Sequence, residues 1–264
     1  MKLLALLFLV VAALSAVLLL DPIPQDPAYH DFADTRRLLG VANFWNVCSN
    51  IALVAAGIAG LAFLKDSDRA GILAELYPVY ALFFGGVLLS GFGSAWYHLR
   101  PANVTLLWDR LPMTIAFMSF FTLILGEQIS ASAARRWFLP LLAVGAASVS
   151  YWFVTETSTL LCGLDSSMTC GDLRPYALVQ FLPLILIPLL LLAGTSPFDR
   201  SAFFWIMILL YAAAKLFEYL DREIFAATGL ISGHTIKHVV AAAAALACLS
   251  GLARRQPVPD DTSP

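Results

Sequence analysis

Long uncharged runs of apolar residues constrain this chain more than any other feature of its sequence. A helix needs about 20 mostly apolar residues to cross the roughly 30 Å of hydrocarbon in a bilayer. Eight runs of about this length lie near residues 2–20, 44–64, 72–98, 105–126, 137–154, 175–193, 202–221 and 233–252. They predict an all-α fold, a polytopic membrane helical bundle whose spans are joined by short loops.

The composition of the chain agrees with a bilayer as its solvent. Hydrophobic residues make up 60% of the sequence and charged residues 13%, against about 45–50% and 25% in ordinary globular chains. The net charge is −2, so the chain lacks the basic field that nucleic-acid binding requires. We therefore expect an integral membrane protein that does not bind nucleic acid.

The first apolar run admits two interpretations. Lys2 followed by an apolar stretch is typical of a cleaved signal peptide and also of a retained helix. The sequence Leu18-Leu19-Leu20-Asp21 stands where a small-residue cleavage site would lie, which favours a retained anchor. We therefore predict an N-terminal hydrophobic anchor, or signal peptide, with its linker at 1–27, a domain of seven spans at 28–252 and a short polar tail at 253–264.

Basic residues in the loops predict how the bundle is oriented. Eight of them fall on the side of the N-terminus and five on the opposite side, and Lys and Arg resist translocation. This favours a multi-pass protein with both termini in the cytoplasm. Cys162 and Cys170 share one loop on the other side, where disulfides persist, so we predict that they pair.

Three of the four histidines lie in or at the ends of spans, where an imidazole is costly and is a default functional candidate. His234 and His238 are four residues apart, so both project from one helix face with Cβ atoms about 5–6 Å apart. This spacing allows two imidazoles to bind one metal ion. His98 ends the second span of the domain, and we expect the fourth histidine, His30, to be a solvated loop residue.

Topology predicts that these groups meet. The spans alternate in direction, so the end of the second span, the start of the third and the start of the seventh lie on one side of the membrane. His98, Asp109 and the His234–His238 pair occupy those three ends, and Ser94 lies one helical turn before His98. We expect one site, close to the non-cytoplasmic face.

Three imidazoles with one open position are typical of a catalytic zinc site, in which water is the fourth ligand. Zinc lowers the pKa of that water to about 7, so that hydroxide can attack a carbonyl at neutral pH. Asp109 could then transfer a proton, and Ser94 could donate a hydrogen bond to the developing oxyanion. Imidazole also suits iron, copper and nickel, so ligand type alone leaves the metal open.

These residues resemble a known family. Ser94-x3-His98, Asp109 and Gly233-His234-x3-His238 before an alanine-rich span are similar to the alkaline ceramidases, within a group of seven-span membrane hydrolases that includes adiponectin-receptor-like proteins. The stretch at 44–50 is similar too. The resemblance implies zinc on the three histidines, with Ser94 and Asp109 assisting. It also implies hydrolysis of the amide bond of ceramide-like membrane lipids to a sphingoid base and a fatty acid, the substrate entering sideways from the bilayer.

The resemblance weakens at two points, the additional N-terminal apolar run and a calcium site. Eukaryotic members resemble one another in an acidic N-terminal calcium site whose last ligand is a glutamate just before the Phe-Trp-Asn stretch. Asn43 stands at that position here, with Asp31 and Asp34 nearby. Calcium on Asp31, Asp34 and Asn43 and a solvated acidic loop without metal are both open interpretations.

Other polar residues of the spans have simpler interpretations. Asn46, Ser49 and Asn50 share one helix face, where we expect them to bridge helices; support of a metal-bound imidazole is the alternative. We predict contact between Lys215 and either Glu218 or Tyr219, and we expect the aliphatic stem of Lys237 to carry its charge to the membrane interface.

Three other functions compete with the hydrolase. The first is an adiponectin-receptor-like receptor or signalling protein with the same zinc site. The second is a membrane cytochrome, because histidines also ligate haem. The third is an intramembrane serine protease with Ser94 as nucleophile, although Ala95 follows the serine where such enzymes usually have glycine. We prefer the hydrolase because Asp109 and three histidines would be unexplained in the protease.

Overall fold

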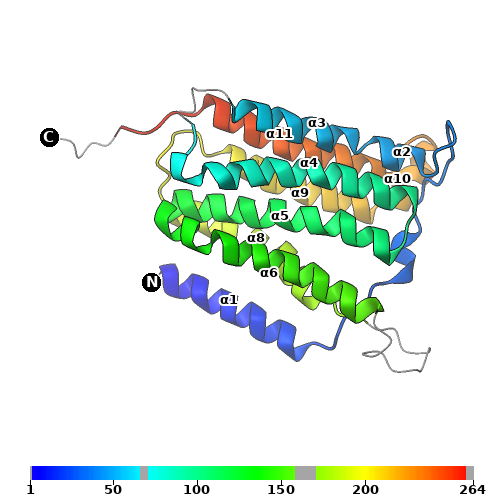
Figure 1. Cartoon of the computed structure of the whole chain (residues 1–264), viewed down its shortest axis with the longest axis horizontal. Coiled ribbons are helices and arrows are strands. Elements are labelled where there is room, and N and C mark those ends of the chain that lie inside the picture. The colour runs from blue at the N-terminus through cyan, green and yellow to red at the C-terminus, as the bar shows by residue number, and fades with distance from the viewer. Residues whose placement is uncertain (1, 66–70, 158–170, 260–264) are drawn as a thin grey trace.

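The structure, a computed structural model of the chain, describes residues 2–65, 71–157 and 171–259, with side chains from residue 7 onward. In these ranges the chain is a helical bundle without β-strands (Figure 1). Two short 3₁₀ helices are η1 (Pro27–His30) and η2 (Ala74–Leu76). The α-helices are α1 (Lys2–Leu19), α2 (Phe44–Cys48), α3 (Ile51–Phe63), α4 (Tyr77–Leu99), α5 (Asn103–Gln128), α6 (Ala131–Thr157), α8 (Arg174–Ala193), α9 (Phe203–Tyr219), α10 (Asp221–Thr228) and α11 (Gly233–Arg254).

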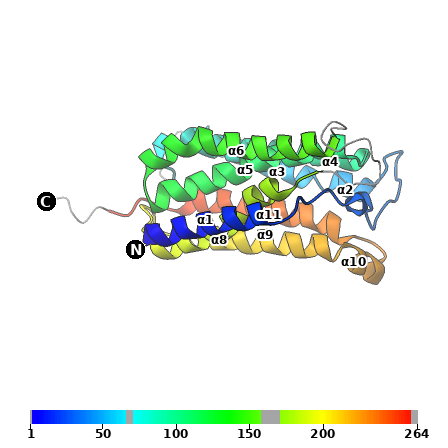
Figure 2. The ribbon, with the colours of Figure 1, turned by 90° about the horizontal axis from the view of Figure 1, so that it is seen from below.

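The predicted polytopic membrane bundle is confirmed. In the described part of the chain, six helical stretches are long and apolar enough to cross a bilayer, and α9 with α10 forms a seventh when the bent pair is one span. The first span combines α2 and α3 as Phe44–Phe63, and the second, Ala74–Leu99, combines η2 and α4. The shorter apolar helix α1 packs along α8 (Figure 2). The proposed division into anchor, domain and tail stays a prediction.

Two spans differ from the expected ones. The seventh run, predicted at 202–221, breaks at Leu220, where the chain turns by 71° from α9 into α10. Helix α6 begins at Ala131, before the predicted 137, and includes Arg135 and Arg136. Both arginines are exposed in the first turns of the helix, so their charges add no polar group to its buried face.

A buried ion pair closes one end of the bundle. Arg255 donates from Nη1 and Nη2 to Glu127 over 2.7 and 2.6 Å and from Nε to the Gly71 carbonyl over 2.7 Å. Both charged side chains are fully buried. The pair connects the end of α11 to α5. Separating the two helices here would be costly, because each charge would be left buried without its partner. The predicted polar tail therefore includes a residue of the packed interior.

The start of α1 and the end of α11 lie at the same end of the bundle, and α2 and α10 lie at the other (Figure 1). Which end faces the cytoplasm stays a prediction. The proposed Cys162–Cys170 pair lies outside the described residues. Of the described cysteines, Cys48 and Cys248 are free.

Candidate metal centre and lipid cavity

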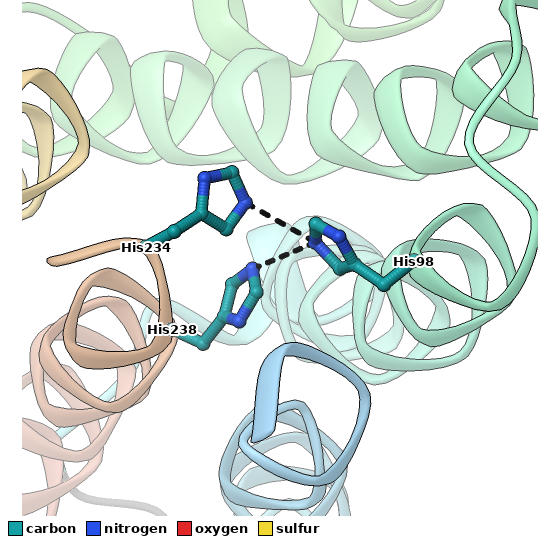
Figure 3. Close-up of side chains that lie close together, drawn as sticks. All are labelled: His98, His234 and His238. Atoms are coloured by element: carbon teal, nitrogen blue, oxygen red, sulfur yellow. Dashed lines mark hydrogen bonds between the residues drawn. The ribbon is translucent and has the colours of Figure 1, made fainter. Parts of the chain in front are cut away.

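Three histidines meet at the end of the bundle away from the termini, as the topology predicted. His98 lies in the last turn of α4, while His234 and His238 lie in the first two turns of α11 (Figure 3). Their exposed fractions are 1%, 5% and 4%. The Nε2 atom of His98 is 3.2 Å from that of His234 and 3.3 Å from that of His238. Among the described residues these are the one group of His, Cys, Asp and Glu side chains placed to share an ion.

Glycines allow the helices to approach closely on both sides of this cluster. A Cβ atom on Gly93 would lie 1.9 Å from the Trp108 carbonyl oxygen, so the missing side chain lets α4 contact α5 next to Ser94 and Asp109. A Cβ on Gly233 would lie 2.1 Å from the Phe217 carbonyl oxygen. Glycine thus sets the helix spacing at two points beside the cluster, as small residues do between membrane helices.

The N-terminus of α11 is fixed by side chains that satisfy its free amides. Ser232 is the N-cap and accepts from the Thr235 amide over 3.2 Å. The Asp221 carboxylate, at the start of α10, accepts from the His234 amide over 2.7 Å. The backbone N–H groups in the first turn of a helix have no acceptor within the helix, and these two side chains accept from two of them. They also set the position from which both histidines project.

The hydrogen bonds around His238 orient its ring for a metal. Ser49 Oγ donates to the Asn46 carbonyl over 3.2 Å and lies 2.8 Å from His238 Nδ1. When the hydroxyl donates to that carbonyl, the hydrogen between Ser49 and His238 comes from Nδ1. A neutral imidazole carries one N–H, so in this tautomer Nε2 keeps its lone pair toward His98.

The donor set fits a zinc ion. Neutral imidazoles cannot satisfy one another here, because a single hydrogen on His98 Nε2 could serve only one of the two facing nitrogens. Tetrahedral zinc with Zn–N bonds of ~2.0–2.1 Å holds its nitrogens ~3.3 Å apart, close to the two distances observed between His98 and its partners. His98, His234 and His238 could therefore hold the ion through Nε2.

The other polar residues of the first span have structural partners as well. Asn46 accepts from the Thr235 hydroxyl over 2.8 Å, and Asn43 donates to the His98 carbonyl over 2.8 Å. Asn50 donates to the Asn46 carbonyl over 2.8 Å. The expected bridging role thus holds for Asn46, whereas Ser49 contacts an imidazole, as the alternative interpretation had it.

Ser94 and Asp109 lie beside the histidines, where the sequence placed them. Both are buried. Ser94 Oγ is 3.4 Å from His238 Nε2, and Ser94, Asp109 and His238 line the same cavity. A hydroxyl therefore lies against the histidine cluster, and a carboxylate faces the cavity next to it.

The segment between α1 and α2 covers this end of the site. The Phe32 ring lies 4.6 Å from the His98 ring and 4.8 Å from the His234 ring, measured between centroids. The expectation that His30 is solvated was wrong. Its Nδ1 lies 2.9 Å from the Tyr97 hydroxyl and its Nε2 lies 3.1 Å from Asn103 Oδ1, because the linker folds back onto α4 and α5.

A cavity of about 400 Å³ adjoins the site. Most of its lining residues are apolar side chains of α4, α5, α8, α9 and α11, and the polar groups near the cluster that line it are Ser94, Asp109, Arg110, Lys215, Glu218, Lys237 and His238. On α4 the lining runs from Ser94 to Phe83, a rise of ~16 Å along the helix axis. The cavity is thus long and apolar with polar groups gathered at one end, which suits an amphiphile.

Two lysines share one carboxylate in the cavity wall. Glu218 accepts from Lys237 Nζ over 2.5 Å and also pairs with Lys215. The predicted contact between Lys215 and Glu218 is confirmed. The expectation that Lys237 extends to the membrane interface was wrong, because α11 packs against α9 and turns this lysine toward Glu218.

Two of the three candidate calcium ligands, Asp34 and Asn43, use their side chains to bind other groups. Asp34 binds Arg36 through both carboxylate oxygens, at 2.8 and 2.6 Å. Burial raises the pKa of Asp34, but the hydrogen bonds and charge of Arg36 outweigh it and hold that pKa below its ordinary value. Asp31 is exposed and the Asn43 amide is bound to His98. Arginine neutralises the one buried carboxylate of the set, so we do not propose calcium here.

Comparison with known proteins gives one match. The family model described as Ceramidase matches residues 37–164, a stretch that contains Ser94, His98 and Asp109 and ends before the two histidines of α11. No curated protein and no solved structure matches the chain.

Proposed function

We propose that this chain, whose residues 37–164 match the family model described as Ceramidase, is a zinc-dependent intramembrane amidase that hydrolyses ceramide-like lipids to a sphingoid base and a fatty acid. One observation carries the proposal. The Nε2 atoms of three buried histidines converge beside a serine and a carboxylate, at the polar end of a cavity lined by apolar side chains.

The protein's own residues divide the chemistry among them. When bound to the three histidines, zinc would polarise the amide carbonyl and lower the pKa of a water molecule to about 7. Asp109 accepts the proton of the attacking water at a carboxylate oxygen and passes it to the leaving nitrogen. The Ser94 hydroxyl, which lies 3.4 Å from His238 Nε2, donates to the carbonyl oxygen as negative charge develops there.

The cavity accounts for the class of substrate. Its apolar walls hold the acyl chain while the amide lies at the polar end. Phe181 of α8 lines the cavity and is 43% exposed on the bundle surface. Helix α9 packs on α11, and α8 packs on α1, α5 and α6. We propose that the lipid enters between α8 and α9, beside Phe181, directly from the bilayer.

Hydrolysis by the purified protein tests this function. We expect ceramide carrying a labelled acyl chain to yield equal molar amounts of sphingoid base and labelled fatty acid, measured by mass spectrometry. Removing zinc with a chelator should stop the reaction and adding zinc should restore it. A protein that binds zinc stoichiometrically and releases neither product would instead fit the receptor alternative.

The Ser49 contact to His238 predicts a change in metal affinity. Substituting Ser49→Ala removes the acceptor of the Nδ1 hydrogen, and partners of this kind typically contribute ~10–100-fold to metal affinity. We expect a loss of that size in competition with a chromogenic zinc chelator. Ser119 is buried with no partner for its hydroxyl among the described residues, so Ser119→Ala is the matched control. If both variants bind zinc with equal affinity, Ser49 does not support the binding of zinc by His238.

A further inference from the structure

Arg110 lines the cavity next to Asp109 and has no role in the proposed chemistry. Its exposed fraction is 5%. The guanidinium donates from Nη2 to the Gln25 side-chain carbonyl over 2.6 Å. Its Nη1 is buried without a hydrogen-bond partner among the described residues. A charged group is therefore held inside the bundle with hydrogen-bonding capacity left over.

A second buried arginine, Arg255, has a carboxylate partner, and Arg110 has none among the described residues. Arg255 has an exposed fraction of 1% and donates from both terminal nitrogens to the Glu127 carboxylate. No salt bridge joins Arg110 to any described carboxylate. Burying a charge is costly unless a partner of opposite charge compensates it. Arg110 therefore lacks the anionic partner that the fold provides to Arg255.

Aromatic rings hold the guanidinium in place without neutralising it. Its Cζ lies 4.3 Å from the centroid of Trp152, 4.9 Å from that of Tyr176 and 5.4 Å from that of Tyr29. Ring faces attract a cation and are typical neighbours of buried arginine. They accept no strong hydrogen bond, so the side chain stays able to bind an anion.

The net charge of the cavity wall also favours an anionic ligand. Among its described lining residues, three are cations and two are anions, which leaves one positive charge before any zinc binds. Glu218 already serves two lysines. The five residues are Arg110, Lys215, Lys237, Asp109 and Glu218.

We infer that Arg110 forms a subsite for an anionic head group, of the phosphate or sulfonate class, carried by the lipid that occupies the cavity. Phosphate and sulfonate oxygens match the planar donor edge of a guanidinium. The inference rests on the proposed function for the lipid nature of the ligand, and it extends that function by naming the charge of the head group.

A binding experiment on metal-free protein tests the subsite without any turnover. The probes are dodecyl phosphate and 1-dodecanol, which share a chain and differ in charge, titrated calorimetrically into protein in neutral phosphatidylcholine nanodiscs. Because a charge-assisted contact is strong, we expect wild type to bind the phosphate ~10-fold or more tightly than the alcohol. Arg110→Gln should abolish this preference. Arg100 is exposed near the same end, so Arg100→Gln should keep it.

Each other outcome has a defined meaning. Inorganic phosphate should bind far more weakly than dodecyl phosphate; equal binding would assign the subsite to free phosphate and overturn the lipid assignment. No preference in wild type, a preference that survives in Arg110→Gln, or equal loss of both probes would overturn the subsite. Arg110→Lys keeps the charge and should retain part of the preference if Arg110→Gln fails to fold. Failure here leaves ceramide hydrolysis untouched, because that activity is measured separately.

Discussion

Replacing His238 by alanine is expected to leave the protein without bound zinc and without amidase activity. The substitution removes one of three Nε2 donors and opens a hole next to Ser94. Two remaining imidazoles lack the set of three protein ligands that catalytic zinc sites use. Zinc content after dialysis, measured by elemental analysis, should fall far below one ion per chain. Turnover should drop by more than the ~10²–10⁴-fold that loss of a single acid–base group costs.

A histidine outside the cluster provides the control for this experiment. His30 is partly buried and hydrogen bonded to Tyr97 and Asn103, so His30→Gln should retain stoichiometric zinc. Comparable amounts of both variants in the membrane fraction would show that neither fails to insert. A His238→Ala protein that keeps its zinc and its activity would remove this histidine from the metal site.

Replacing Asp109 by asparagine should separate metal binding from catalysis. The amide has the same shape as the carboxylate, but it cannot take up a proton. We expect full zinc content and a fall in kcat of ~10²–10⁴-fold, with KM less affected. The limb of the pH–rate profile that depends on this carboxylate should disappear as well.

The matched control is a carboxylate far from the site. Asp199 lies between α8 and α9 at the end of the bundle near Arg255, where it accepts from the Gln256 amide. Asp199→Asn should keep both zinc and turnover. If Asp109→Asn turns over as fast as wild type, another group moves the proton; if it loses zinc, Asp109 acts on the metal site and not on the substrate.

Much of this fold follows from elementary properties of the sequence. The apolar runs predicted the spans because a helix must be both long and uncharged to cross a bilayer. Alternation of span direction then placed His98, Asp109 and the two histidines of α11 at one level. The structure brings His98 Nε2 within hydrogen-bonding distance of the Nε2 atoms of both other imidazoles. Local pattern and topology were sufficient for the metal cluster because each ligand lies at the end of a regular helix.

The contacts of the linker could not be predicted in the same way. Gln25, Tyr29 and Phe32 reach Arg110, Glu218 and the histidine rings only because residues 20–43 fold back across the end of the bundle. No periodicity governs an irregular segment, so its path depends on tertiary contacts. His30 was assigned to solvent for this reason.

The orientation of individual side chains could not be predicted from the sequence either. Lys237 lies between two ligand histidines, and a membrane-interface position was the simplest expectation for an isolated lysine. Its partner Glu218 is 19 residues away, on the helix that packs against α11. Ser49 likewise contacts His238 across 189 residues of sequence. Such pairs depend on the rotation of one helix against another, which hydropathy does not encode.

X-ray absorption at the zinc edge of the purified protein would show directly whether the three imidazoles hold one catalytic zinc ion. We expect one zinc per chain, bound by three histidine nitrogens and one further oxygen at ~2.0–2.1 Å. A sulfur shell at ~2.3 Å, fewer than three histidine ligands, or a protein that takes up no zinc would contradict it.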